Sequence, residues 1–429
     1  MNIDGSKKFA KKFIHAYYHK SVNHIAKFLK WTVISVITGI VVGGISTLFA
    51  FCMNTATQYR IANDYIILFL PFAGIITVFL YNIFNYKNDK GTNLVLSTIH
   101  AKSELPFKMA PLIFIATVLT HLFGGSAGRE GAALQLGGSI ANQLGRWFRL
   151  DDADKRVVVL CGMSAAFSAV FGTPMAAALF SLEVVSIGIM YYAALVPCVF
   201  SSIIAVNFAV SFGISESDFK PLDFPEISIL NSVETVALSF LCALLSIVFI
   251  IIMHRTGDIF RKYLKNPYVR IFMAGCVIVL LTFIIGTRDY NGTGMSVVFR
   301  ALDGQADWYA FILKIIFTAI TIESGFRGGE IVPSFFIGAT FGCCFGQLIG
   351  FSPSACAAIG LIAMFCGVTN CPITSMLLSF ELFGAGGIPY FMICVAVSYF
   401  MSGYYGLYKE QTIVYSKYRT KFLNRKTRQ

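Results

Sequence analysis

Apolar residues fill most of the chain in long runs that glycine clusters and short polar stretches interrupt. We count about ten to fourteen apolar segments at or below the roughly 20 residues that a helix needs to cross the hydrocarbon core. The alternation of apolar and polar residues that marks strands is missing, and only helices or a closed barrel can span a bilayer. The pattern therefore predicts an all-α, polytopic membrane protein.

Composition and charge agree with this class. Of the 429 residues, 56% are hydrophobic and 13% are charged, and the mean hydropathy is +0.70. The net charge of +12 gathers in the segments 1–30 and 409–429. The positive-inside rule then places both termini in the cytoplasm, with an even number of crossings. We attribute these basic ends to topology and lipid contact, and expect no nucleic-acid partner and no removed signal peptide.

The chain repeats itself at one constant offset. "GMSAAFSAVFGTPMAAALFSLE" from Gly162 is similar to "GLIAMFCGVTNCPITSMLLSFE" from Gly360, and the shared offset also pairs Glu183 with Glu381. We expect this pair of acids to have a structural role at helix ends. Weak repetition of this kind is typical of transporters. The predicted organisation is two membrane repeats, 31–212 and 229–408, which a polar linker, 213–228, separates.

Glycine-rich breaks precede three apolar runs. "GGSAGREG" leads into "AALQLGGSIANQLGRWF", "SGFRGGEIVP" leads into "SFFIGATFGCCFGQLIG", and "GTNLV" begins a third run. Pro333 suits a first helical turn, where its missing N–H has no partner in any case. Three helix N-termini carry unpaired N–H groups and positive dipole ends. If they meet near the midplane they form an anion site, so the expected substrate is an anion.

Glu130 is the most important candidate functional residue in such a site. A carboxylate at membrane depth costs at least roughly 2.5 kcal/mol and marks function by default. Beside donors that favour anions, it competes with the substrate as a carboxylate and leaves the site when protonated. Glu130 is thus a candidate gate and proton carrier. The alternative is a structural pair of Glu130 with Arg129 at an interfacial helix start.

The stretch "GGSAGREGAALQLGGSIANQLGRWF" strongly resembles the G-R-E-G signature of the CLC family of anion channels and proton-coupled antiporters. From roughly Lys90 to Tyr408, "GTNLV" stands at the place of the family's G-S-G-I-P and "GGEIVP" at the place of its G-x-F-x-P. The resemblance implies tilted, partly re-entrant helices in two inverted repeats. It also implies a homodimer with one pathway per subunit, for which 191–212 and 389–401 are candidate faces.

The same resemblance assigns roles to residues. Glu130 resembles the family's external gating glutamate, and the amides of Ile331 and Val332 match those that line the central site. Tyr408 resembles the tyrosine that closes the inner side, with Tyr404, Tyr405 and Tyr415 as neighbouring alternatives. The candidate anion-binding residues are Gly91, Thr92, Asn93, Gly128, Arg129, Gly131, Gly329, Ile331, Val332 and Tyr408.

Two departures from the chloride-transporting pattern bear on the substrate. Thr92 replaces the serine of the first motif, and Glu330 replaces an apolar residue in the third. A Gly-Gly-Glu start with a non-serine residue is similar to the bacterial fluoride-exporting branch, although that branch commonly has Met or Asn at the Thr92 position and Thr at the Val332 position. We therefore expect a fluoride/proton antiporter. A chloride/proton antiporter or passive chloride channel is the alternative, because the Thr92 hydroxyl can coordinate chloride.

Glu330 has two interpretations. When protonated it can donate an O–H to fluoride or relay the proton that leaves Glu130, and otherwise it is a helix-start residue that faces water. Because about twenty residues follow Tyr408, we expect no large regulatory domain and a bacterial plasma-membrane location.

An enzyme, a metal site and a cofactor are not expected. "GGSAG" formally matches G-x-S-x-G, with Ser126 as nucleophile and His121 nearby, which leaves an intramembrane serine protease as a rival. A nucleophile elbow needs a strand before the turn, however, and an apolar helical run precedes this serine. The cysteines form no C-x-x-C array.

Overall fold

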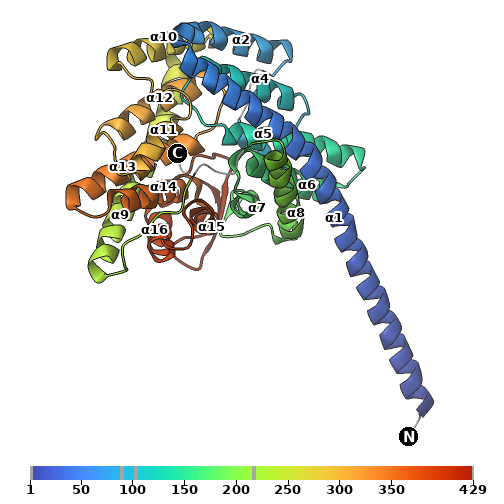
Figure 1. The fold of residues 1–429 in the computed structure, drawn as a ribbon. Coiled ribbons are helices and arrows are strands. Elements are labelled where there is room, and N and C mark those ends of the chain that lie inside the picture. The colour runs from blue at the N-terminus through green and yellow to red at the C-terminus, as the bar shows by residue number, and fades with distance from the viewer. Residues whose placement is uncertain (1–2, 87–90, 101–104, 215–218, 428–429) are drawn as a thin grey trace.

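The computed structural model describes residues 3–86, 91–100, 105–214 and 219–427. The first half of the chain forms α1 (Ile3–Ala62), η1 (Asp64–Phe69), α2 (Leu70–Ile83), α3 (Thr92–Ile99), α4 (Met109–Leu122), α5 (Glu130–Trp147), α6 (Asp152–Phe171), α7 (Pro174–Glu183), η2 (Tyr192–Ala194) and α8 (Leu195–Ser211). The helices pack into one body from which the start of α1 projects (Figure 1).

The second half of the chain adds a similar series of helices. These are α9 (Ile229–Tyr263), α10 (Pro267–Ile285), α11 (Met295–Leu302), α12 (Ala310–Ser324), α13 (Ile331–Ile349), α14 (Pro353–Thr369), α15 (Pro372–Phe383) and α16 (Ile388–Met401). In Figure 1 they lie beside the helices of the first half. The predicted helical class is therefore confirmed.

Helices of two lengths make up the membrane part. Within the described residues, six helical segments are long and apolar enough to cross a bilayer: Val22–Ala62, Asp64–Ile83, Tyr192–Ser211, Ile229–Tyr263, Pro267–Ile285 and Ile331–Ile349. Four more apolar helices have only 10–17 residues, too few for a full crossing at 1.5 Å per residue. The predicted mixture of complete and partial spans is thus present.

Both halves contain the same close helix crossing. A β-carbon on Gly162 would lie 2.3 Å from the carbonyl oxygen of Gly137, where α6 crosses α5. A β-carbon on Gly360 would likewise lie 2.3 Å from the carbonyl oxygen of Gly338, where α14 crosses α13. Small residues let helix backbones approach closely in membranes. Each crossing fixes the tilt of a helix, α5 or α13, that begins inside the protein.

Glu183 and Glu381 link the two halves reciprocally. The carboxylate of Glu381 on α15 accepts the N–H groups of Met175 at 2.7 Å and Ala176 at 2.8 Å at the start of α7. The carboxylate of Glu183 at the end of α7 accepts the N–H of Thr374 at 2.8 Å at the start of α15. Each acid thus satisfies first-turn donors of the other helix. The structural role predicted for this pair is confirmed.

A small sheet, which the sequence did not predict, lies at the C-terminal end. β2 (Thr412–Tyr415) pairs in parallel with β1 (Ser186–Ile187) and antiparallel with β3 (Phe422–Lys426). The strands have two, four and five residues, too short for a visible period of two. The sheet attaches the segment after α16 to the first half of the chain.

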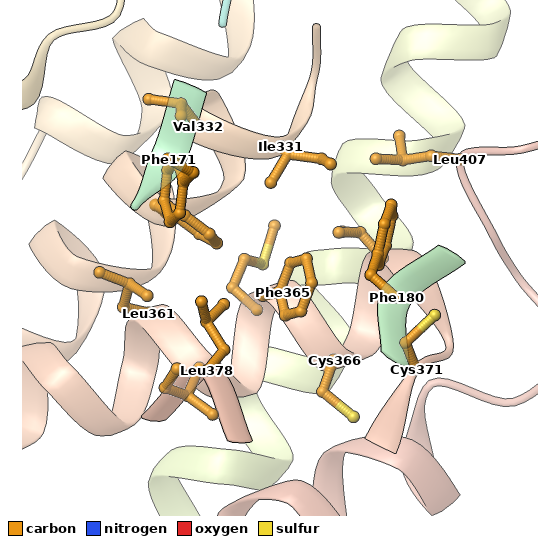
Figure 2. Close-up of a cluster of buried hydrophobic side chains, with 14 of the residues drawn as sticks. Phe171, Phe180, Ile331, Val332, Leu361, Phe365, Cys366, Cys371, Leu378 and Leu407 are labelled. Carbon is orange, nitrogen blue, oxygen red and sulfur yellow. The ribbon is translucent and has the colours of Figure 1, made fainter. Parts of the chain in front are cut away.

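Aromatic rings fill the centre between the halves. The ring centroids of Phe167 on α6 and Phe180 on α7 lie 5.3 Å apart, and those of Phe335 on α13 and Phe365 on α14 lie 5.5 Å apart. Phe180 and Phe365, 6.0 Å apart, join the two pairs. Figure 2 shows Phe180 and Phe365 together with Ile331 in this apolar cluster. The core therefore lies directly against the start of α13.

We predict that Gly360→Ala lowers stability. The added β-carbon meets the Gly338 carbonyl oxygen, so α13 and α14 must separate, at an overpacking cost of about 1–3 kcal/mol. The unfolding temperature in detergent measures the effect. Gly44→Ala on α1 is the control, since its β-carbon meets only Phe208, at 3.4 Å. Equal unfolding temperatures for the two variants would contradict the close-packing argument.

Candidate functional site

A pair of backbone hydrogen bonds joins the segments that precede α5 and α13. The N–H of Gly128 donates to the oxygen of Gly329 at 2.7 Å, and the N–H of Gly329 donates to the oxygen of Gly128 at 2.7 Å. A β-carbon on Gly329 would lie 2.6 Å from the nitrogen of Gly131, so glycine is needed for this approach. The first turns of α5 and α13 consequently lie side by side.

The start of α3 reaches the same point. Gly91, at φ +58°, is its N-cap, and Thr92 is its first residue. A β-carbon on Gly131 would lie 3.0 Å from the Cα of Gly329 and 3.2 Å from the Oγ1 of Thr92. None of the three helices has a side-chain hydrogen bond at its N-cap. The starts of the three helices therefore meet at one point, the arrangement for which the sequence predicts an anion site.

Glu130 lies inside this group of donors. Its side chain is fully buried, and its Oε2 accepts the N–H of Arg129 at 3.0 Å. Its Oε1 has no hydrogen-bond partner among the residues that the structure describes. The N–H of Val332, on the first turn of α13, also faces the carboxylate. The Glu130 carboxylate thus stands where an anion would meet the two helix starts.

Arg129 contributes charge from the edge of the site. Its Nε lies 3.9 Å from Oε1 of Glu130, and its Nη1 donates to Oδ1 of Asn54 on α1 at 3.1 Å. The ion pair considered from the sequence is therefore present, but its acid is buried at the helix starts and not at an interface with water. The pair and the donor cluster share one carboxylate.

Glu330 and Tyr408 complete the centre. Glu330 is the N-cap residue of α13. The hydroxyl of Tyr408 is buried, has no hydrogen-bond partner in the described part of the chain, and interacts electrostatically with the carboxyl groups of both Glu330 and Glu130. An unpaired buried hydroxyl next to helix starts is a donor available to a bound anion.

The other tyrosines considered are engaged elsewhere. Tyr404 bonds Ser416 through its hydroxyl at 2.6 Å, and Tyr415 lies on β2 with 43% of its surface exposed. For Tyr405 the structure gives a main-chain contact, in which its carbonyl oxygen accepts a hydrogen bond from Asn370. The contacts therefore favour Tyr408 over Tyr404 and Tyr415 as the site tyrosine.

Ile331 and Val332, the first two residues of α13, are buried. The two residues are 0% and 2% exposed. Figure 2 shows them at one edge of the apolar cluster, near Phe171 and Leu407. Because the side chains anchor the first turn of α13 in the core, the N–H groups of that turn have a fixed direction.

Thr92 contacts a residue that the sequence analysis missed. The Nε2 of Gln135 on α5 donates to the oxygen of Gly131 at 3.2 Å and lies 3.5 Å from Oγ1 of Thr92, while its Oε1 has no partner among the described atoms. The signal was its position, a lone polar residue in "GAALQLGG", one turn after the break. Asn93 instead accepts the N–H of Glu410 at 3.0 Å, so its oxygen holds the segment that follows Tyr408.

A third carboxyl group, also missed, lies near Glu330. Glu323 at the end of α12 packs into a notch on α9, where a β-carbon on Gly257 would lie 2.0 Å from its Oε2. The charges of Arg261 and Lys409 surround it, and it interacts electrostatically with Glu330. No motif marked it, because its neighbours come from distant parts of the sequence.

A cavity of about 200 Å³ opens beside the gate position. We call it the Glu130 pocket, and its lining includes Asn54, His121, Arg129, Glu130, Phe171 and Val332. It lies at the C-terminal ends of α1 and α4. The cavity therefore leaves a space next to the Glu130 carboxylate that is large enough for a small ion.

The serine protease alternative finds no support in the geometry. Ser126 Oγ pairs with Oγ1 of Thr318 at 3.1 Å. Both ring nitrogens of His121 face carbonyl oxygens, those of Thr117 and Ala127. The two residues thus form no nucleophile–base pair, and the turn follows a helix where a nucleophile elbow follows a strand.

Comparison with known proteins agrees with this architecture. The family model described as "Voltage gated chloride channel" matches residues 73–403. A chloride/fluoride channel protein of Pseudomonas syringae pv. tomato is 33% identical over 396 residues, which are 91% of this chain and 88% of that protein. An H(+)/Cl(−) exchange transporter, ClcA of Vibrio cholerae, is 26% identical over 302 residues, 64% of each chain.

Solved structures give the same result. A crystal structure of a CLC-type fluoride/proton antiporter matches with a TM-score of 0.86 and 30% identity, over 89% of this chain and 98% of that one. A slow cyanobacterial Cl⁻/H⁺ antiporter matches in fold, with a TM-score of 0.76 and 18% identity over 87% and 94%. The family match spans most of the chain and includes all three helix starts of the site. The protein therefore belongs to the voltage-gated chloride channel family, the CLC family.

Proposed function

We propose that this CLC protein exports fluoride in exchange for protons, with Glu130 as the gate. The observation that carries the proposal is the position of the Glu130 carboxylate, buried among first-turn N–H groups of α5 and α13. Two similar proteins, named as a chloride/fluoride channel protein and as a fluoride/proton antiporter, support the choice of ion.

Competition for one set of donors couples the two substrates. An ionised Glu130 accepts hydrogen bonds from the helix starts and so excludes an anion from them. A proton that neutralises the carboxylate removes its attraction to these donors and leaves them to the incoming anion. Anion and proton therefore occupy the site in turn, which is the requirement for exchange.

Glu330 and Tyr408 make the inner part of the proposed pathway. Fluoride is small and strongly hydrated, so a site that binds it must replace its water with short, well-aimed donors. The Tyr408 hydroxyl has no other partner among the described atoms, and a protonated Glu330 supplies a second O–H. We propose that Glu330 also receives the proton that Glu130 releases.

Chloride/proton exchange, or passive chloride flow, is the second candidate. The Thr92 hydroxyl at the start of α3 favours it, because a hydroxyl at this position can coordinate chloride. The similarity to an H(+)/Cl(−) exchange transporter points the same way. Both candidates use the same donors and differ in which ion fits them.

The proposed setting is a bacterial plasma membrane with both termini in the cytoplasm. The Glu130 pocket lies at the end of α1 far from the N-terminus, so it then opens toward the outside. We further propose a homodimer that pairs the faces of α8 and α16. These helices expose large apolar side chains, among them Ile203 and Met392 at 46% and 55%.

The first prediction concerns the ion. Liposomes that contain the protein and are loaded with fluoride should take up protons as fluoride leaves, because each exchange cycle moves both ions in opposite directions. A pH electrode and a fluoride electrode record the two fluxes, and chloride-loaded liposomes are the comparison. Faster proton-coupled flux of chloride than of fluoride would favour the second candidate, and anion flux without proton movement would favour a channel.

Glu130→Gln should abolish proton movement, with a decrease of about 100-fold or more, since the amide cannot carry a proton through the site. Anion flux in this variant either persists without coupling or stops. The electrode assay measures both quantities. Glu226→Gln removes an exposed carboxyl group of the linker and should exchange ions as the unaltered protein does. Intact exchange in Glu130→Gln contradicts the gate.

Glu330→Gln should weaken proton coupling by about tenfold or more while fluoride still binds, since Glu330 is proposed to pass on the proton that Glu130 releases. Proton flux comes from the same liposomes, and fluoride binding from calorimetry on the purified protein. Unchanged coupling would remove the relay and leave Glu330 as a helix-start residue.

A further inference from the structure

His121 has a hydrogen-bond pattern that a neutral ring cannot satisfy. It lies in the last turn of α4 and is fully buried. Its Nδ1 is 2.9 Å from the oxygen of Thr117, and its Nε2 is 2.9 Å from the oxygen of Ala127. Carbonyl oxygens only accept hydrogen bonds, and a neutral imidazole has one N–H and one lone pair. One of the two contacts therefore pairs a lone pair with an oxygen unless the ring is protonated.

Several charged groups surround the ring. Arg60 on α1 donates to the carbonyl oxygen of His121 at 2.7 Å, and Arg129 and Glu130 line the same pocket as His121. Farther out, Arg288 and Lys314 lie near Arg60. Burial opposes a charge on the ring, and so do Arg60 and Arg129. The carbonyl oxygens at the end of α4 favour a charge, because a helix C-terminus attracts cations.

The occupant of the Glu130 pocket determines whether the effects that favour a charged ring or those that oppose it prevail. With the pocket empty and Glu130 protonated, no negative charge in the described lining of the pocket offsets the arginines, and we expect a neutral ring with one carbonyl contact unsatisfied. An anion in the pocket supplies the missing negative charge, at short range and away from bulk water. Protonation then gives both ring nitrogens an N–H to donate.

We propose that His121 is a proton site linked to the anion, which binds a proton when an anion enters the Glu130 pocket and releases it when the anion leaves. The proposal rests on the proposed anion pathway and adds a second titrating group to it. Glu130 gives a competition between proton and anion. At His121 the coupling has the opposite sign, because a bound proton and a bound anion each strengthen the binding of the other. The protonated ring then holds the anion in the Glu130 pocket until the Glu130 carboxylate leaves the N–H donors.

Linkage makes the coupling measurable in both directions. We expect fluoride affinity to rise by up to about tenfold per pH unit as pH falls through the titration of His121. The measurement needs Glu130→Gln, since Glu130 itself titrates and masks the effect. Calorimetry with sodium fluoride on the purified full-length protein gives the affinity at each pH.

The second variant is the double substitution Glu130→Gln with His121→Gln. Its fluoride affinity should change less with pH than that of Glu130→Gln alone, and the difference is the contribution of His121. Any pH dependence that remains comes from Glu330 and other groups. The matched control is Glu130→Gln with His254→Gln, which removes another buried histidine, on α9 and outside the pocket lining. This control should keep the full pH dependence.

A direct measurement keeps the His121 ring in place and follows its protonation. In the ¹⁵N spectrum of histidine-labelled Glu130→Gln, added fluoride should move both ring nitrogens of His121 to the imidazolium position at a pH where they start neutral. The missing signal in the His121→Gln variant assigns the resonance. A neutral spectrum that fluoride leaves unchanged from pH 8 down to the lowest pH at which the protein stays folded overturns the proposal.

Two failures are distinguishable. Fluoride binding with a pH dependence that is equal with and without His121 overturns the linkage alone and leaves the anion pathway intact. Absence of both fluoride and chloride binding to Glu130→Gln contradicts the anion site itself, and the linkage with it.

Discussion

The two hydrogen bonds between Gly128 and Gly329 determine the rest of the site. They hold the segments before α5 and α13 so close that a β-carbon on Gly329 would lie 2.6 Å from the nitrogen of Gly131. Two helices from different halves of the chain therefore begin at one point. Their free N–H groups, which water satisfies at ordinary helix ends, face each other inside the protein. Such a centre is stable only with an anion or a carboxylate in it, and Glu130 supplies the carboxylate.

The repeated architecture explains why the centre lies between the halves. The glycine crossings of α5 with α6 and of α13 with α14 set the direction of each broken helix. Glu183 and Glu381 then fix the halves to each other by satisfying donors across the boundary. These acids show the same chemistry as Glu130, a carboxylate on first-turn N–H groups. Glu130 in addition lines a cavity, the Glu130 pocket.

The sequence predicts the parts of this site whose cause is local. Glycine clusters before apolar runs predict the starts of α3, α5 and α13, and the internal repeat predicts that two of them are equivalent. Glu130 and Glu330 follow from their positions at those starts. The sheet at Thr412–Tyr415 was missed because its strands are too short to show a period. Gln135 and Glu323 were missed because their importance comes from neighbours that only the fold brings near.

The apolar cluster behind Ile331 and Val332 determines how strongly proton and anion are coupled. If water reached the helix starts freely, it would satisfy the N–H groups, and the site could stand empty between anions. Phe180, Phe365 and the side chains around them close that side with carbon. In this low-dielectric surrounding an unoccupied cluster of donors is costly, and an uncompensated carboxylate is more costly still. In the proposed exchange the centre is therefore hardly ever empty, and an anion leaves it as the Glu130 carboxylate enters. Strict alternation of this kind follows from the absence of a third occupant, so mutations that admit water behind α13 are expected to loosen coupling before they weaken binding.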